Sequence, residues 1–269
     1  AQEQGRTLET YELLNKEGGF NKEAFDAKVN GLLAKQDSLV ILLNTPAHNP
    51  TGYSLTLSDW DKVIETLSSA GSDKKITLFV DIAYIDFAGD EEEYRQFLPK
   101  LEELPANVLP VLGYSASKTF TLYGMRCGAM ICMAKTAEIA AEFKQVCEFS
   151  ARATWSNSTR AAQKVIANIY EDEKLLARVN EERKQYRDML VARGRAFEKS
   201  AKEAGLEIVP FDSGFFASIP CPNPDEISRK LEKEGIFIVP LAKGLRVSVA
   251  SISEERCAAI PFKIAEAMK

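Results

Sequence analysis

Short apolar runs alternate with helical patterns through the first half of the 269-residue chain. Residues 39–43 (LVILL), 75–80 (KITLFV) and 107–112 (NVLPVL) are short and largely apolar, which is typical of strands in a sheet covered on both faces. Residues 20–36 and 56–71 carry apolar side chains at helical spacing. The pattern predicts an α/β fold, with a mostly parallel sheet and helices on both faces.

A further helix around residues 91–103 and a strand over residues 127–134 (CGAMICMA) complete this half. Residues 158–205 then change the pattern, because they are rich in helix formers and contain no proline. We expect one very long helix there, or two in tandem. For the helix predicted over residues 56–71, we expect Thr56 or Ser58 as the N-terminal cap.

The C-terminal part has a pattern of its own. After the segment of residues 206–220 we expect a helix over residues 224–235, a strand over residues 236–251 and a final helix from Glu254. This order predicts a small α/β domain. We place the boundary inside the long helical segment, so that residues 1–185 form the large domain and residues 186–269 the small one.

Composition excludes several classes of function. The formal net charge is -5 and basic residues are scattered among acidic ones, so no nucleic-acid-binding surface is indicated. No apolar run is long enough to span a membrane. One histidine cannot form the usual imidazole metal site, so no metal is expected. The five cysteines are odd in number and lie mostly in apolar segments, which indicates free buried thiols and a cytoplasmic location.

Polar residues gather directly after three of the predicted strands, where ligands collect in open α/β sheets. They are His48 and Asn49, then Asp81 and Tyr84, then Ser115, Ser117 and Lys118, with Arg126 further on. Singly, an acid after a strand is usually a helix cap, and a lysine is usually solvated. Together they match the needs of pyridoxal phosphate, which requires a lysine, an acid for its ring nitrogen, and a cation with hydroxyls for its phosphate.

Five motifs occur in one order along the chain: AHNPTG, DIAY, SASK with a downstream arginine, RATWSN and GLRVSVA. In this respect the sequence resembles the class I aminotransferases of the aspartate and aromatic amino acid subgroup, which have the fold-type-I architecture. The resemblance implies pyridoxal 5'-phosphate as cofactor, and the exchange of an amino group between an amino acid and a 2-oxo acid.

The resemblance also implies residue roles at the cofactor. Lys118 would bind the cofactor covalently and move a proton at the substrate Cα, and Asp81 would hold the pyridine nitrogen. Tyr84 and Asn49 would donate hydrogen bonds to the phenolic oxygen of the ring, and Asn49 would also border the substrate. His48 would lie behind Asp81 as its supporting partner.

Two groups of residues would hold the charged ends of the cofactor and substrate. Ser115, Ser117 and Arg126 would bind the phosphate. Arg246, in GLRVSVA, would pair with the substrate α-carboxylate, since a guanidinium fits a carboxylate with two parallel hydrogen bonds. Arg152, in RATWSN, would cross a homodimer interface to read a side-chain carboxylate in the neighbour's active site.

Departures from the family leave the substrate open among aspartate, glutamate and aromatic amino acids. The chain reads MRCG where the family often reads ERVG, AYIDF where it often reads AYQGF, and SNST where it usually reads SNPP. The resemblance covers the later two thirds of the family's length. We therefore expect a fragment without the Gly-rich phosphate-binding turn and with an exposed sheet edge.

Two alternative functions stay open, because a fold does not choose a reaction. One is another fold-type-I enzyme, such as a carbon-sulfur lyase or a decarboxylase. The other is a pyridoxal-phosphate-sensing domain of a transcription regulator, which a DNA-binding region upstream of Ala1 would support.

Overall fold

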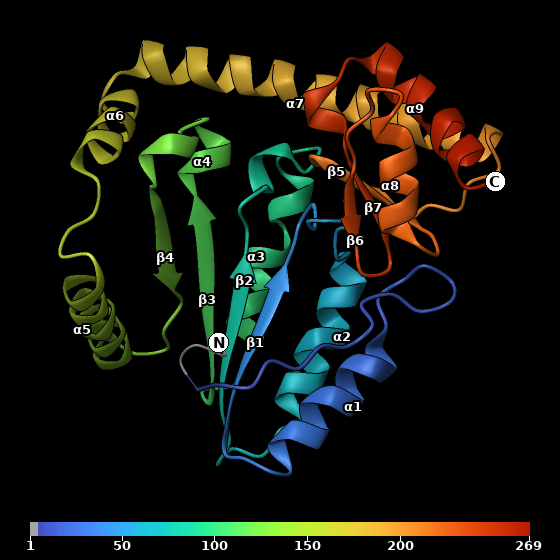
Figure 1. Ribbon diagram of the computed structural model, residues 1–269. Coiled ribbons are helices and arrows are strands. Elements are labelled where there is room, and N and C mark those ends of the chain that lie inside the picture. The colour runs from blue at the N-terminus through green and yellow to red at the C-terminus, as the bar shows by residue number, and fades with distance from the viewer. Residues whose placement is uncertain (1–4) are drawn as a thin grey trace.

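Two β-sheets organise residues 5–269, the part of the chain that the computed structural model describes (Figure 1). The larger sheet has the strand order β1-β2-β3-β4. Its strands are β1 (Ser38–Asn44), β2 (Lys75–Asp81), β3 (Val108–Ser115) and β4 (Gly128–Cys132). The first three run parallel, and β4 runs antiparallel to β3. The predicted α/β fold with a mostly parallel sheet is confirmed.

One face of this sheet carries the main apolar core. Ile41 on β1 pairs in register with Leu78 on β2, and both side chains are buried. The helices that contribute to this core include α1 (Lys22–Leu33) and α2 (Leu57–Ser68), and the fully buried Trp60 of α2 belongs to it. Alternate side chains of the strands therefore point toward the helices, and they pack against the apolar face of each helix.

The opposite face of the same sheet is more open. Val40 and Leu42 on β1 are 71% and 63% exposed, and Met130 on β4 is 55% exposed. A cavity of about 420 Å³ lies along the outer strand β1, and both Val40 and the α1 residue Leu32 line it. β1 and β4 are the outer strands of the sheet. The open sheet edge that the sequence predicts is present.

Two helix predictions have different outcomes. Thr56 is the cap of α2: its hydroxyl accepts a hydrogen bond from the Asp59 amide, and the Asp59 carboxylate accepts one from the Thr56 amide. The single helix expected around residues 91–103 is wrong. Three short turns replace it, because Pro99 lacks the amide that a continuous helix would donate to the Arg95 carbonyl. They are two 3-10 turns, Glu93–Arg95 and Leu101–Glu103, with α3 (Phe97–Lys100) between them.

The long helical segment forms two helices in tandem, α6 (Arg160–Glu171) and α7 (Glu173–Glu203). Asp172 separates them, because its side chain accepts the amides of the first turn of α7 and caps that helix. Before them, α5 (Ala137–Thr154) stands beside β4 in Figure 1. Within residues 5–269, none of the helices has the length and apolar character that a membrane crossing needs.

The small domain has its own sheet, in the order β5-β7-β6. Its elements are β5 (Phe216–Pro220), α8 (Pro224–Glu232), β6 (Val239–Leu241), β7 (Gly244–Ser248) and α9 (Glu254–Ala267). The single strand predicted over residues 236–251 is wrong. The chain turns between β6 and β7, and the two pair as an antiparallel hairpin. On its other side β7 pairs with β5, and Gly244 permits that close approach, since a Cβ there would lie 2.2 Å from Ile219 O.

A separate apolar core supports this domain. It includes Phe197 of α7, Leu231 of α8, Leu245 of β7 and Ile264 of α9, all fully buried. The boundary near residue 185 stays a prediction. All five cysteines are free, but Cys257 alone is buried and the other four are half-buried, so the expectation of buried thiols is correct for Cys257 alone.

Candidate active site at the carboxyl ends of the strands

The loop after β1 is folded back onto the end of β2. The Asn44 side chain accepts the Asn49 amide at 2.7 Å through Oδ1 and donates to Asp81 O at 3.1 Å through Nδ2. Asn44 is the last residue of β1 and pairs in register with Asp81. One side chain therefore fixes the distance between the loop and the neighbouring strand end.

The small domain holds the same loop from the other side. Asp212 accepts the Ser54 amide at 2.7 Å, and its own amide donates to Gly52 O at 3.0 Å. The Ser218 hydroxyl donates to Pro50 O at 2.8 Å. Asp212 and Ser218 were not among the residues predicted from the sequence. No local signal could have found them, because their partners lie 158 and 168 residues away along the chain.

Three of the predicted residues meet in one hydrogen-bonded group. Asn49 Nδ2 donates to the Tyr84 hydroxyl at 3.4 Å, and Arg246 donates to Asn49 Oδ1 at 3.0 Å. The Arg246 guanidinium also lies 4.4 Å from the centre of the Phe216 ring. Burial raises the pKa of Tyr84, and the hydrogen bond from Asn49 opposes that shift. The Tyr84 hydroxyl is therefore neutral and available as a donor.

Lys118 lies beside this group. It belongs to α4 (Ala116–Thr119), a single helical turn that directly follows β3. Its Nζ is 5.6 Å from the centre of the Tyr84 ring and 5.2 Å from that of Tyr123. Asp81 ends β2 three residues before Tyr84, and its Oδ1 accepts the Ala83 amide at 3.0 Å. Tyr123 was not predicted, although it is an aromatic residue only five positions after Lys118 in the sequence, and this proximity could have indicated it.

The predicted phosphate-binding residues are spread more widely. Ser117 is 4% exposed, and Ser115 is half-buried at the end of β3. Arg126 is exposed and donates to Tyr123 O at 3.0 Å. Its backbone is left-handed, with φ of 51°. A guanidinium with one short-range partner has donors free for an anion.

His48 does not show the expected contact. Its Nδ1 lies 2.8 Å from the Thr51 hydroxyl, and the residue lines the cavity along β1. Among the hydrogen bonds of residues 5–269, none joins His48 to Asp81. Burial lowers the pKa of His48 to about 4, so the ring is neutral at pH 7.

Arg152 lies apart from the cluster. It is exposed in the last turn of α5 and donates to the Ser156 hydroxyl at 2.6 Å. The nearby Trp155 is 65% exposed. Within this one chain, the structure therefore does not bring Arg152 to Lys118.

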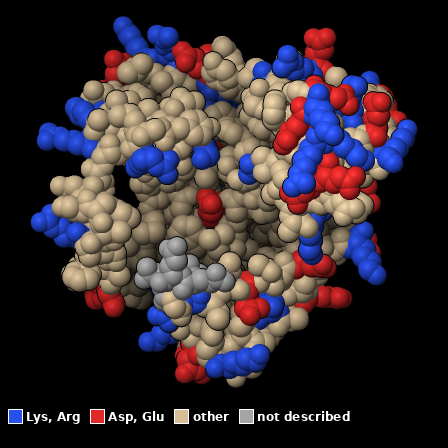
Figure 2. All heavy atoms as spheres, viewed as in Figure 1, with Lys and Arg blue, Asp and Glu red and all other residues tan. Residues whose placement is uncertain are grey.

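The cluster as a whole is open to a ligand. Figure 2 shows a hollow on this face of the molecule, mainly lined by uncharged atoms, with most charged side chains around its rim. An amide, a phenol and an amine that follow β1, β2 and β3 converge with a guanidinium from β7, and the Asp81 carboxylate ends β2 three residues before the phenol. This donor set fits pyridoxal phosphate, which presents an aldehyde, a ring nitrogen and a phenolic oxygen.

Sequence comparison gives a family. The family described as "Aminotransferase class I and II" matches residues 2–260. The aromatic-amino-acid aminotransferase of Escherichia coli (strain K12) is 29% identical over 234 residues, which are 84% of this chain and 56% of that protein. The aspartate aminotransferase of the same strain is 28% identical over 87% of this chain and 58% of its own length. The chain thus spans less than two thirds of these relatives.

Solved structures give the same fold. An aminotransferase from Anaerococcus prevotii superposes with a TM-score of 0.95 at 37% identity, covering 98% of this chain and 65% of that one. The aromatic-amino-acid aminotransferase of Burkholderia pseudomallei, covalently bound to pyridoxal phosphate, superposes with a TM-score of 0.82 at 24% identity. It covers all of this chain and 65% of its own.

Proposed function

The chain belongs to the class I and II aminotransferase family, and from this premise we propose that the complete protein exchanges an amino group between an amino acid and a 2-oxo acid. Pyridoxal 5'-phosphate is the proposed cofactor. The observation that carries the proposal is the position of Lys118, whose amine lies beside Tyr84 in the group that contains Asn49. We also propose a cytoplasmic location, which the free cysteines support.

The cofactor, when bound, supplies an electron-withdrawing ring that stabilises negative charge on the substrate carbon. Lys118 would hold it covalently and move the proton at the substrate Cα. Asp81 would keep the ring nitrogen protonated, and Tyr84 and Asn49 would donate to the phenolic oxygen. The remaining contacts are those proposed for the phosphate, made by Ser115, Ser117 and Arg126.

Arg246 would orient the substrate through its α-carboxylate. It is half-buried, it stacks on Phe216, and its hydrogen bond to Asn49 uses one of its five donors. The remaining donors can form the paired hydrogen bonds that a carboxylate accepts. Since all amino acids carry this carboxylate, replacement of Arg246 should slow all substrates alike.

A test of the site is to add pyridoxal phosphate, reduce with borohydride and map the labelled peptide. We expect a pyridoxyl group on Lys118 and none on Lys135, which is exposed. Labelling of another lysine would contradict the assignment. Replacing Asp81 with Ala should lower kcat on the order of a thousandfold while cofactor stays bound, because a charge partner is lost and the phosphate contacts remain. The exposed Asp73→Ala variant is the matched control.

We propose further that the protein is a homodimer with shared active sites and that Arg152 reads a side-chain carboxylate in the partner's site. In support, Arg152 is exposed, and so are Val146 and Phe149 of α5 and Trp155, which directly follows that helix. An exposed apolar strip on one helix suits an interface core. Aspartate and glutamate would then be the favoured substrates.

Mixed variants test the shared site. A Lys118→Ala protein and an Arg152→Leu protein should regain activity with aspartate when mixed, because hybrid dimers contain one intact site. No recovery, with subunit exchange shown independently, would contradict sharing.

Substrate choice has a separate test. Arg152→Leu should lower kcat/KM for aspartate on the order of a hundredfold and spare phenylalanine, because a neutral substrate does not use the lost charge. Equal losses for both would make Arg152 structural. The assay should require a 2-oxo acid, since a lyase or a decarboxylase would consume the amino acid without one.

A further inference from the structure

The helical turn that carries Lys118 is too short to be stable alone. α4 has four residues, and isolated short helices are unstable in water. The turn is closed by the Phe120 amide, which donates to Ala116 O at 3.1 Å, and by the Thr121 amide, which donates to Lys118 O at 3.2 Å. The position of the Lys118 amine therefore depends on what the turn contacts.

A buried carboxylate anchors this turn. The Thr119 hydroxyl, next in sequence to Lys118, donates to Asp86 Oδ2 at 2.6 Å. Asp86 and Thr119 are 5% and 7% exposed. Arg95 donates to the other oxygen, Asp86 Oδ1, at 2.6 Å, so both carboxylate oxygens have partners. Burial of a charge is costly and adds little stability even when the charge is paired. The arrangement therefore points to a role in geometry.

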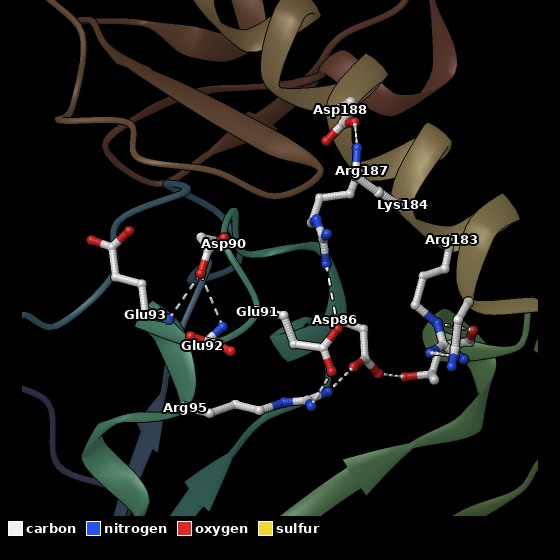
Figure 3. Close-up of polar contacts among 12 residues, drawn as sticks. Asp86, Asp90, Glu91, Glu92, Glu93, Arg95, Arg183, Lys184, Arg187 and Asp188 are labelled. Atoms are coloured by element: carbon white, nitrogen blue, oxygen red, sulfur yellow. Dashed lines mark hydrogen bonds and ion pairs between the residues drawn. The ribbon is translucent and has the colours of Figure 1, made fainter. Parts of the chain in front are cut away.

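The same network reaches the helix that leads into the small domain (Figure 3). Arg95 also pairs with Glu91, and Arg187 of α7 lies 3.8 Å from the Glu91 carboxylate. Arg183, one turn earlier on α7, donates to Thr119 O at 3.4 Å and lies 5.3 Å over the Phe120 ring. The turn of Lys118 is thus held by two contacts at Thr119: its hydroxyl binds Asp86, and its carbonyl accepts a hydrogen bond from Arg183 of α7.

We propose that Asp86 is a positioning residue for Lys118, acting through the hydroxyl of Thr119. The inference rests on the proposed function, because the reaction of Lys118 is itself proposed there.

The test compares Thr119→Val and Asp86→Ala with two matched variants. Thr119→Ser keeps the hydroxyl, and Asp90→Asn changes an exposed carboxylate that caps the amides of Glu92 and Glu93. The first readout is the rate at which borohydride traps pyridoxal phosphate on Lys118, at saturating cofactor. We expect a fall of about tenfold in Thr119→Val and Asp86→Ala, since small displacements of a reacting group are costly. Thr119→Ser and Asp90→Asn should stay within about twofold of the unaltered chain.

The double variant, with both Thr119→Val and Asp86→Ala, tests whether Asp86 acts through Thr119. If Asp86 acts through Thr119, the pair of substitutions should slow trapping no more than either one alone. Multiplied effects would mean that the two residues act independently. A lower unfolding temperature with an unchanged trapping rate in the folded protein would make Asp86 merely structural, and either result would overturn the inference.

A second readout needs no cofactor. Hydrogen exchange of the Phe120 and Thr121 amides should be at least about tenfold faster in Asp86→Ala, with exchange on β1 unchanged. If the unaltered chain traps no cofactor on Lys118, the proposed function fails. Hydrogen exchange of the Phe120 and Thr121 amides still tests whether Asp86 holds the turn. Unchanged exchange in the turn would overturn the inference.

Discussion

The two sides of the candidate site differ in how the rest of the chain holds them. On one side, Asn49, Tyr84 and Arg246 come from three distant parts of the sequence and are joined by hydrogen bonds. Arg126, on the other side, and Arg152, which lies apart from the cluster in this chain, are both exposed. Their described hydrogen bonds reach partners three and four residues away. The first side is preorganised by tertiary contacts, and the second is held locally.

The cause is the burial of the supporting elements. The loop after β1 lies between the β2 strand end and the small domain, which fix it from two directions. Residues 121–158 lie on the edge strand β4 and on α5, and α5 has no buried residue. A segment with few buried contacts gains little free energy from its own order. Its arginines suit roles that need a ligand or a partner chain.

The two tryptophans of the chain test this difference most strongly. Trp60 is 1% exposed and stacks on Phe97, with the ring centres 4.8 Å apart, whereas Trp155 is 65% exposed. Trp60→Ala should lower the free energy of unfolding by about 4 kcal/mol, because it leaves a large cavity. Trp155→Ala should change it by less than about 0.5 kcal/mol. Urea unfolding of dilute protein without cofactor measures both, and equal costs would remove the contrast.

Two glycines provide a smaller contrast. Gly52 has φ of +79°, and a Cβ there would lie 2.3 Å from the Phe211 ring and 2.7 Å from Phe216 O. Gly124, in the exposed segment, has no heavy atom within 4 Å of such a Cβ. Gly52→Val should cost about 3 kcal/mol from backbone strain and overpacking together.

Gly124→Val is the control and should cost less than about 1 kcal/mol. Thermal unfolding of both variants shows whether the loop after β1 is fixed as tightly as its contacts indicate. A fully tolerated valine at position 52 would mean that the small domain can shift away from the loop.

The lone histidine gives the smallest effect. The pKa of His48 in the folded protein is about 4, below the usual 6.5, so the folded state binds a proton more weakly than the unfolded chain does. The stability contribution is therefore present above pH 6.5 and is lost as the pH falls. Between pH 7 and pH 5.5 the loss should be about 1 kcal/mol.

Urea unfolding at the two pH values measures this loss, and His48→Gln is the reference. The difference between the two proteins isolates the histidine from the carboxyl groups, including Asp212, whose pKa burial raises. An equal pH dependence in both proteins would show that His48 is not buried in a neutral form.

Some parts of the site were predictable because they depend on local pattern. The apolar runs place Asp81 and Lys118 at the ends of parallel strands, and such ends meet at one edge of a sheet. The cap at Thr56 follows from the capping-box spacing. The hairpin of β6 and β7 was missed because apolar residues occur on both sides of its short turn at residues 242–243. The turns over residues 93–103 were missed because the single residue Pro99 interrupts the helix.

The sequence by itself determined the α/β class, the family resemblance and the set of residues that we propose as cofactor ligands. Only the tertiary structure decided their partners: Arg246 with Asn49 across 197 residues, Asp212 with Ser54 across 158, and His48 with Thr51 instead of Asp81. Periodicity records which face of an element is buried. It does not record which distant polar group meets which, because such pairs form only when packing removes the competing water.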